Sequence, residues 1–309
     1  MDLRVPAPHA VIEVGSEDGA RLRIRRHGVA SGPRLLISHG NGFGIDGYFN
    51  FWSRFLGAFD VVVFDMRSHG QNAGLNPGVD PAHHDYAHMT RDLDAVCRAV
   101  DEEFGSKPTA GVFHSMSAQC AMLQALVGRS EFAALVLFDP PNVPPPGHPV
   151  RVKMAEYEHK LAHWARHRRA HFDDPLALAT DYANTRSGQR WARGTAELMA
   201  RAVLQPDPKG GWALACPKEL EASMYLQGIP LGLWPKRRQF AMPVRLIGAD
   251  PDAPYPAATG LSNRALAIEG GFDYLAIPGT SHLLQLEEPA ACAEGAIEFL
   301  SKTGFSPGI

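Results

Sequence analysis

A serine stands at the junction of two contrasting stretches of sequence, where its hydroxyl could act as a nucleophile. The apolar run at residues 110–113 predicts a buried strand, and a helix is expected to begin near Ser115, within the segment His114–Ser117. A serine at such a tight turn presents its hydroxyl at the carboxyl end of the sheet, beside N–H groups that the helix itself leaves unpaired. Those N–H groups can stabilise an oxyanion as it develops. The pattern therefore predicts nucleophilic catalysis at Ser115.

A histidine follows the last strand-like run of the chain. His282 lies in the segment 278–283, directly after the strand expected over residues 274–277, and it is the only histidine there. An uncharged imidazole can take the proton of a serine hydroxyl and return it to the leaving group. His282 is therefore the expected general base.

The elements around these residues alternate between strands and helices. Two short strands are expected in the first 30 residues, followed by apolar strand-like runs at 34–38, 61–65, 110–113, 134–138, 244–248 and 274–277. This alternation predicts an α/β fold with a mostly parallel central sheet flanked by helices. Prolines crowd the stretch after Asp139, and the region beyond shows helical patterns without a convincing buried strand. We therefore expect a core of residues 1–140 and 240–309, with a mainly helical cap inserted at 141–239.

The motifs resemble those of the α/β-hydrolase fold superfamily, specifically its serine hydrolases with a helical cap. The nucleophile turn of that family reads G-x-S-x-G, often with His before the serine and Met after it. The segment His114-Ser115-Met116 matches, whereas Phe113 and Ser117 replace the two glycines. The segment 64–70 resembles the family's structural D-x-R-G-x-G stretch, and 278–282 resembles its P-G-x-x-H loop. The resemblance covers residues 10–140 and 240–302.

The resemblance also implies which groups complete the site. The backbone N–H groups of Asn41, in the loop His39–Phe43, and of Met116 would form the oxyanion hole. The acid that orients the histidine usually follows the strand after the insertion, which favours Asp250. Asp252, two residues later, and Asp139, at the end of the strand before the insertion, stay open as alternatives.

Three side chains near these motifs are expected to contact the substrate. Phe43, Phe113 and His114 lie by sequence at the mouth of the site, and two of them are apolar. A small, fairly apolar substrate is therefore the plainest expectation.

Other kinds of protein are less compatible with the sequence. The chain has 30 basic and 33 acidic residues, a formal charge of −3 that argues against a nucleic-acid-binding protein. Histidines recur every fourth residue from 159 to 171 and would share one helix face, but arginines crowd them and no carboxylate completes a metal motif. We expect no metal and no cofactor. No apolar run is long enough to span a membrane. The four cysteines are widely scattered, which favours a cytoplasmic protein without disulfides. A homodimer is compatible with the sequence.

The predicted function is cleavage of an ester-like bond (carboxylester, lactone or thioester) through an acyl-enzyme. A C–C hydrolase, lyase or isomerase of a biosynthetic or degradative pathway is one alternative, because the same machinery could serve it. A ligand-binding or receptor-like protein without turnover is another, and Phe113 at the elbow favours it. Epoxide hydrolases and dehalogenases of this fold use aspartate at the elbow, so Ser115 argues against both.

Overall fold

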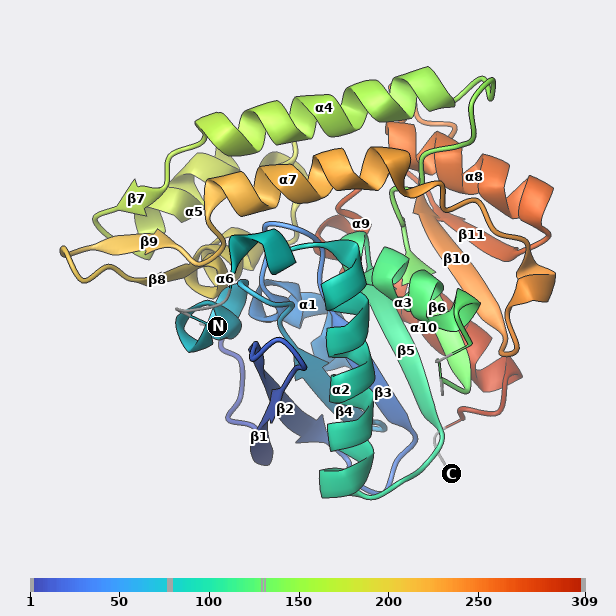
Figure 1. The fold of residues 1–309 in the computed structure, drawn as a ribbon, viewed down its shortest axis with the longest axis horizontal. Helices are drawn as coiled ribbons and strands as arrows, with labels where there is room; N and C mark the ends of the chain where they lie inside the picture. The colour runs from blue at the N-terminus through green and yellow to red at the C-terminus, as the bar shows by residue number, and fades with distance from the viewer. Residues whose placement is uncertain (1–2, 77–79, 129, 131, 307–309) are drawn as a thin grey trace.

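An eight-stranded sheet forms the centre of the computed structural model, which describes residues 3–76, 80–128, 130 and 132–306 (Figure 1). The strands lie in the order β1-β2-β4-β3-β5-β6-β10-β11. Their bounds are β1 Ala10–Gly15, β2 Arg21–Gly28, β3 Arg34–Ser38, β4 Asp60–Phe64, β5 Thr109–His114, β6 Ala134–Phe138, β10 Val244–Ala249 and β11 Asp273–Ile277.

The direction of the strands confirms the predicted fold class. β1 and β2 form an antiparallel hairpin, and β2 also pairs antiparallel with β4. All the remaining pairs, from β4 through β3, β5, β6 and β10 to β11, are parallel. Every residue of β3, β4, β6 and β10 is buried, because helices cover both faces of a parallel sheet. These four strands are therefore mostly apolar in sequence, with Arg34, Asp60 and Arg245 as buried charged exceptions.

Helices cover the two faces of the sheet and form a separate hydrophobic core on each. One core contains residues of α1 and α10, and the other contains residues of α2, α3 and α8. Helix α2 begins where the Asp85 side chain accepts a hydrogen bond from the N–H of His88. The bounds are α1 Phe49–Trp52, α2 Tyr86–Phe104, α3 Met116–Leu126, α8 Ala258–Gly270, α9 Leu284–Glu287 and α10 Pro289–Lys302.

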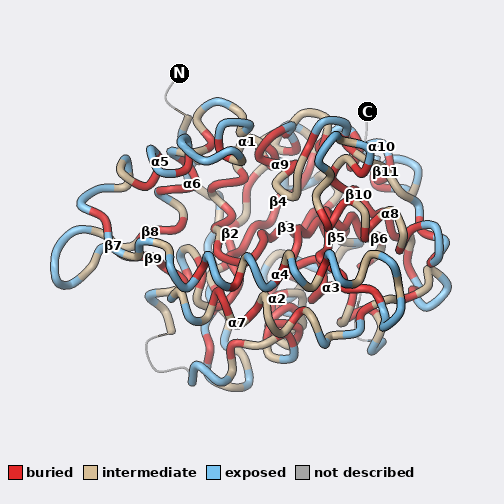
Figure 2. Tube along the Cα trace, turned by 90° about the horizontal axis from the view of Figure 1, so that it is seen from above, coloured by how far each residue is buried: buried red, intermediate tan, exposed pale blue. Residues whose placement is uncertain are grey.

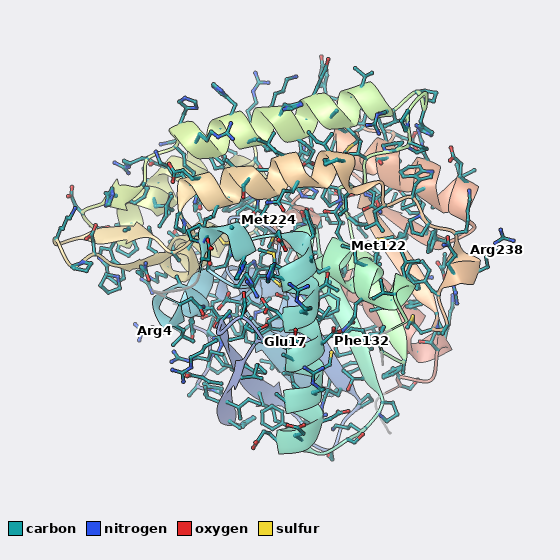
Figure 3. The ribbon with its side chains drawn as sticks, viewed as in Figure 1. Arg4, Glu17, Met122, Phe132, Met224 and Arg238 are labelled. Atoms are coloured by element: carbon teal, nitrogen blue, oxygen red, sulfur yellow. The ribbon has the colours of Figure 1, made fainter. Side chains whose placement is uncertain are left out.

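The chain between β6 and β10 packs across the end of the sheet at which β5 and β6 finish (Figure 1). From above, α4 and α7 run side by side over the central strands (Figure 2). Met224 lies on the side of α7 that faces the core, where it is buried (Figure 3). The elements are α4 Arg151–His167, β7 His171–Phe172, α5 Pro175–Ala183, α6 Thr195–Val203, β8 Leu204–Pro206, β9 Trp212–Leu214 and α7 Lys218–Gly228.

A small sheet within this region was not predicted. Its strand order is β7-β9-β8, with both pairs antiparallel. Strands of two or three residues are too short to show an alternating pattern, so the sequence carries no periodic signal for them.

The remaining helical segments are short 3-10 turns at Ile45–Tyr48, Ser53–Phe55, Gly70–Leu75, Pro81–His83, Gly188–Arg190, Ile229–Leu231 and Arg237–Gln239. Within the described ranges, none of the helices combines the length and apolar character that crossing a membrane requires.

Candidate active site

The backbone of Ser115 adopts a conformation that non-glycine residues rarely take. Ser115 connects β5 to α3 with φ 56° and ψ −118°. Its N–H donates to the carbonyl of Phe138 at 2.9 Å, and its carbonyl accepts from Gln119 N–H at 3.1 Å. Strained residues of this kind cost about 1–3 kcal/mol and cluster at functional sites. In the described part of the chain only Ser68, Ser115 and Asp139 combine a side chain with positive φ.

Two hydrogen bonds join Ser115 to His282 and His282 to a carboxylate. The Ser115 hydroxyl lies 3.0 Å from Nε2 of His282. On the other side of the ring, Nδ1 lies 2.7 Å from Oδ2 of Asp139. With the imidazole neutral, Nδ1–H donates to the carboxylate and leaves Nε2 to accept the serine proton. The geometry is that of a serine–histidine–aspartate triad.

The carboxylate that reaches His282 belongs to Asp139, which the sequence analysis ranked below Asp250. Asp139 directly follows β6 and has φ 42°, and its side chain is fully buried. Its Oδ1 accepts from the amide of Ala249 and from Nδ2 of Asn263, both at 3.0 Å. Oδ2 is thereby left for the imidazole. These bonds hold the carboxylate in one orientation.

The expected acid, Asp250, is therefore corrected, because its side chain is bound to backbone elsewhere. Its carboxylate accepts from Gly279 N–H at 2.7 Å and from Asp252 N–H at 2.8 Å, and these bonds lower its pKa. Asp252 is exposed and pairs with Arg264 at 2.6 Å. Asp250 lies beside the loop that carries His282, but it holds the backbone of that loop rather than the imidazole.

The loop after β3 packs directly against the nucleophile. A Cβ placed on Gly40 would lie 3.0 Å from Cβ of Ser115, so only glycine allows this approach. The next residue, Asn41, is buried, and its side chain donates to the carbonyl of Glu221 at 2.8 Å. Neither the backbone N–H of Asn41 nor that of Met116 donates a hydrogen bond to any described residue. Both amides are thus available beside Ser115.

His114, expected as a substrate contact, is buried and bonds to the backbone of His282. Its Nε2 lies 2.9 Å from the carbonyl of His282, and its Nδ1 lies 2.8 Å from the hydroxyl of Tyr48. Burial lowers the pKa of His114 well below its usual value, so the ring is neutral. Nε2–H therefore donates to His282, and Tyr48 donates to Nδ1. The ring fixes the backbone of His282.

A family model described as the alpha/beta hydrolase family matches residues 35–295 of the chain. The chain belongs to this family. Solved structures agree in fold, and no match is found among curated protein sequences. The structure of E-2-(acetamidomethylene)succinate hydrolase is 17% identical with a TM-score of 0.75, over 94% of this chain and 100% of that one.

Two further similar structures are of a thioesterase domain and of an esterase. A thioesterase domain from the curacin biosynthetic pathway is 18% identical with a TM-score of 0.65, over 93% of this chain and 98% of that one. A thermophilic esterase from Thermogutta terrifontis is 18% identical with a TM-score of 0.65, over 95% and 99%. Identities this low establish the shared fold and leave the reaction to be argued from the site.

Phe113, which replaces the first glycine of the family's elbow, is accommodated by a glycine two positions earlier. Its side chain is fully buried and packs edge-on against Phe132, so it does not line the substrate site as expected. Residues 111 and 113 point to the same side of β5. A Cβ on Gly111 would lie 2.5 Å from the Phe113 ring. Ser117, which replaces the second glycine, is buried and bonds to the backbone of His114.

Phe43 is the one expected substrate contact that remains next to both the core and the inserted region. Its ring is partly buried and meets Tyr48 and Trp191 edge-on, at centroid distances of 6.3 and 6.4 Å. The ring centroid of Trp191 in turn lies 5.1 Å from that of Tyr182 in α5. An aromatic surface therefore extends from the loop after β3 into the inserted region.

The inserted region also brings charged residues to the site, and the sequence analysis did not find them. Glu221 of α7 lies over Gly42, where a Cβ would meet its carboxylate. Glu221 is buried and pairs with the partly buried Arg168 at 3.3 Å. Tyr157 of α4 places its ring edge-on to the ring of His282, with 6.2 Å between centroids.

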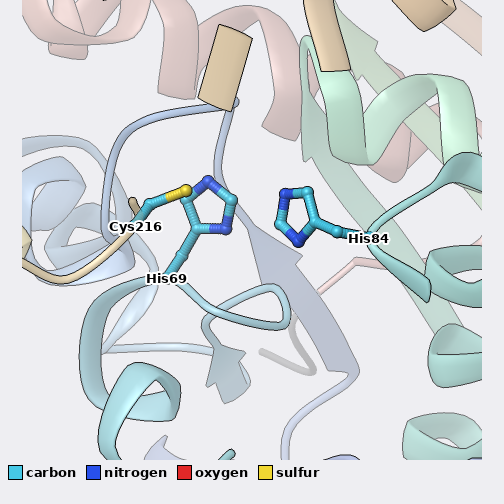
Figure 4. A group of neighbouring side chains, drawn as sticks. All are labelled: His69, His84 and Cys216. Atoms are coloured by element: carbon cyan, nitrogen blue, oxygen red, sulfur yellow. The ribbon is translucent and has the colours of Figure 1, made fainter. Parts of the chain in front are cut away.

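A buried group of two histidines and a cysteine lies beside the loop that follows β3 (Figure 4). The ligand atoms of His69, His84 and Cys216 lie within 4.8 Å of one another. His69 already uses both nitrogens, donating to the carbonyl of Arg67 at 2.8 Å and accepting from Gly42 N–H at 3.0 Å. Burial lowers the pKa of His84 to about 4, so its ring is neutral. A metal ion would have to displace Gly42, and we assign none.

The histidines that recur every fourth residue do not share one helix face throughout. His163 and His167 lie next to each other on α4, with tilted rings whose centroids are 4.2 Å apart. His171 lies beyond the end of α4, on β7, and pairs with Asp207 at 2.8 Å. The expectation of one continuous helix through His171 is therefore wrong, because α4 ends at His167.

Proposed function

We propose that the protein is a serine hydrolase that cleaves an ester-like bond through an acyl-enzyme. The observation that carries the proposal is the hydrogen-bonded chain from Ser115 through His282 to Asp139, with separations of 3.0 and 2.7 Å. Ser115 is the nucleophile, His282 the general base and Asp139 the orienting acid.

In this mechanism Ser115 Oγ attacks the acyl carbon while its proton passes to Nε2 of His282. Asp139 stabilises the imidazolium through Nδ1–H. The amides of Asn41 and Met116 donate to the oxyanion of the tetrahedral intermediate. The imidazolium then protonates the leaving group. A water molecule, deprotonated by His282, hydrolyses the acyl-enzyme and restores the serine.

Carboxylesters, lactones and thioesters all suit this chemistry. The similar structures named an esterase and a thioesterase domain support an acyl substrate. A C–C hydrolase remains the second candidate, because the same serine and oxyanion hole serve attack on a ketone carbonyl. The receptor-like alternative loses its main support, since Gly111 accommodates Phe113 without displacing the elbow.

We further propose that residues 141–239 act as a cap over the site. Glu221 meets the loop that carries Asn41, and Trp191 meets Phe43 of the same loop, so the cap contributes to substrate binding as well as to exclusion of water. All four cysteines are free thiols, as a cytoplasmic protein requires. The cytoplasmic setting and the homodimer stay predictions.

A fluorophosphonate probe tests the proposal. The wild-type protein should form an adduct on Ser115, located by peptide mass spectrometry, and Ser115→Ala should form none. A panel of short-chain esters, thioesters and lactones should then show turnover that depends on Ser115. If the folded protein forms no adduct and turns over none of these substrates, the proposed hydrolase function is refuted.

A further inference from the structure

One acidic side chain in the cap is buried without any partner. Glu158 lies on α4 and is 2% exposed. Its Oε1 is buried and makes no hydrogen bond, and no basic side chain in the described ranges pairs with its carboxyl group. Carboxyl groups are almost never buried in this way unless they are paired, because desolvation is costly. An unpaired one therefore indicates a missing partner.

Glu158 occupies the inward-facing side of α4. Met154, Glu158 and Ala162 are buried at successive intervals of four residues, so they share one face of the helix. Met154 packs in one small apolar cluster and Ala162 in another. A leucine or alanine at 158 would join these clusters without cost. The position holds a carboxyl group instead.

Three tyrosines from three helices lie close enough to Glu158 for its charge to act on their phenols. They are Tyr86 of α2, Tyr157 of α4 and Tyr225 of α7. Burial raises the pKa of each of these phenols. The Glu158 carboxylate raises it further, although for Tyr225 the Glu221 carboxylate contributes more. Aromatic faces around a carboxylate are the environment in which proteins bind ammonium groups.

The surrounding tyrosines connect Glu158 to the triad. Tyr157 meets the ring of His282 edge-on. Tyr86 donates to Oε1 of Gln119 at 2.6 Å, and Gln119 lies in the first turn of α3, with its N–H bonded to the carbonyl of Ser115. The part of α4 that carries Glu158 therefore lies next to His282.

We propose that Glu158, with Tyr86, Tyr157 and Tyr225, forms a subsite for a cationic, ammonium-type group of the substrate. This inference rests on the proposed function and narrows it to acyl substrates that carry a basic or quaternary nitrogen. The positive charge of the substrate would pair with the Glu158 carboxylate, for which the described part of the protein provides no basic side chain. A neutral substrate leaves the carboxyl group protonated and unpaired.

Matched ester pairs test the subsite. Acetate esters of choline and of its longer homologues are compared with the neutral tert-butyl analogues of the same shape. The wild type should favour the cationic member in kcat/KM by about tenfold at the best length. One contact between a cation and a site without water changes affinity by about this factor. In Glu158→Gln the ratio should fall to about one. Glu156→Gln, an exposed position on the same helix, should keep the wild-type ratio.

A binding experiment separates failure of the subsite from failure of the hydrolase. Calorimetric titration of Ser115→Ala with choline should show binding that Ser115→Ala/Glu158→Gln lacks. If no ester is hydrolysed but choline still binds through Glu158, the subsite stands and the proposed reaction fails. If esters are hydrolysed with no preference for charge, or with a preference that survives Glu158→Gln, the subsite is refuted.

Discussion

Replacing Glu158 by glutamine should stabilise the protein, and should do so only above mildly acidic pH. Burial raises the pKa of Glu158 from 4.5 to about 8. Between these values the folded chain holds a proton that the unfolded chain has lost, so the free energy of unfolding falls as pH rises. Well below pH 4.5 the residue is protonated in both states and contributes no such penalty.

The size of the effect follows from the difference between the two pKa values. Each pKa unit corresponds to about 1.4 kcal/mol, so the penalty for ionised Glu158 is on the order of 5 kcal/mol above pH 8. Glutamine has nearly the same shape and no charge to lose. Glu158→Gln should therefore match the wild type at about pH 4 and exceed it by several kcal/mol at about pH 9.

Urea unfolding of both proteins across this pH range measures the difference directly. Glu156→Gln serves as the control, because Glu156 is exposed on the same helix and should change stability little at any pH. A stability difference between Glu158→Gln and wild type that stays constant with pH would refute the argument. So would a wild type that gains stability relative to the variant as pH rises.

Two further substitutions test the packing behind the nucleophile. Gly111→Ala should destabilise the fold by about 1–3 kcal/mol in chemical denaturation, because its Cβ would meet the Phe113 ring. In a Phe113→Ala background the same Gly111→Ala change should cost clearly less, because the ring that it would meet is absent. An equal cost in the two backgrounds would refute this account of the elbow. Tyr48→Phe should cost about 1–3 kcal/mol by leaving Nδ1 of His114 unpaired, and an unchanged unfolding midpoint would contradict the hydrogen bond.

The sheet was predictable from the sequence, and Ser115 and His282 could be singled out as candidates, because their signals are local. Each of Ser115 and His282 directly follows an apolar strand within a recognisable motif. The acid could not be chosen from the nearby sequence alone. Asp139 and Asp250 follow neighbouring strands, β6 and β10, and the decision depends on the positive φ of Asp139 and on bonds from Ala249 and Asn263. Only the assembled fold supplies those partners.

Two other site features had signals that the sequence analysis passed over. Gly111 and Phe113 share a strand face, so the glycine could have been interpreted as space for the ring. Glu158 lies four residues from both Met154 and Ala162, which placed a carboxyl group on the inward face of a helix. By contrast, the pairing of Arg168 with Glu221 joins residues 53 positions apart, and no sequence pattern predicts it.

The rate of fluorophosphonate labelling at Ser115 in two aspartate variants tests the triad most directly. Asp139→Asn should slow labelling by about 10³–10⁴-fold, because the imidazole loses the carboxylate that fixes its tautomer. Asp250→Asn should label within a few-fold of the wild type, since Asp250 bonds only to backbone. Full-speed labelling of folded Asp139→Asn, or a large loss confined to Asp250→Asn, would contradict the assignment of Asp139 as the catalytic acid.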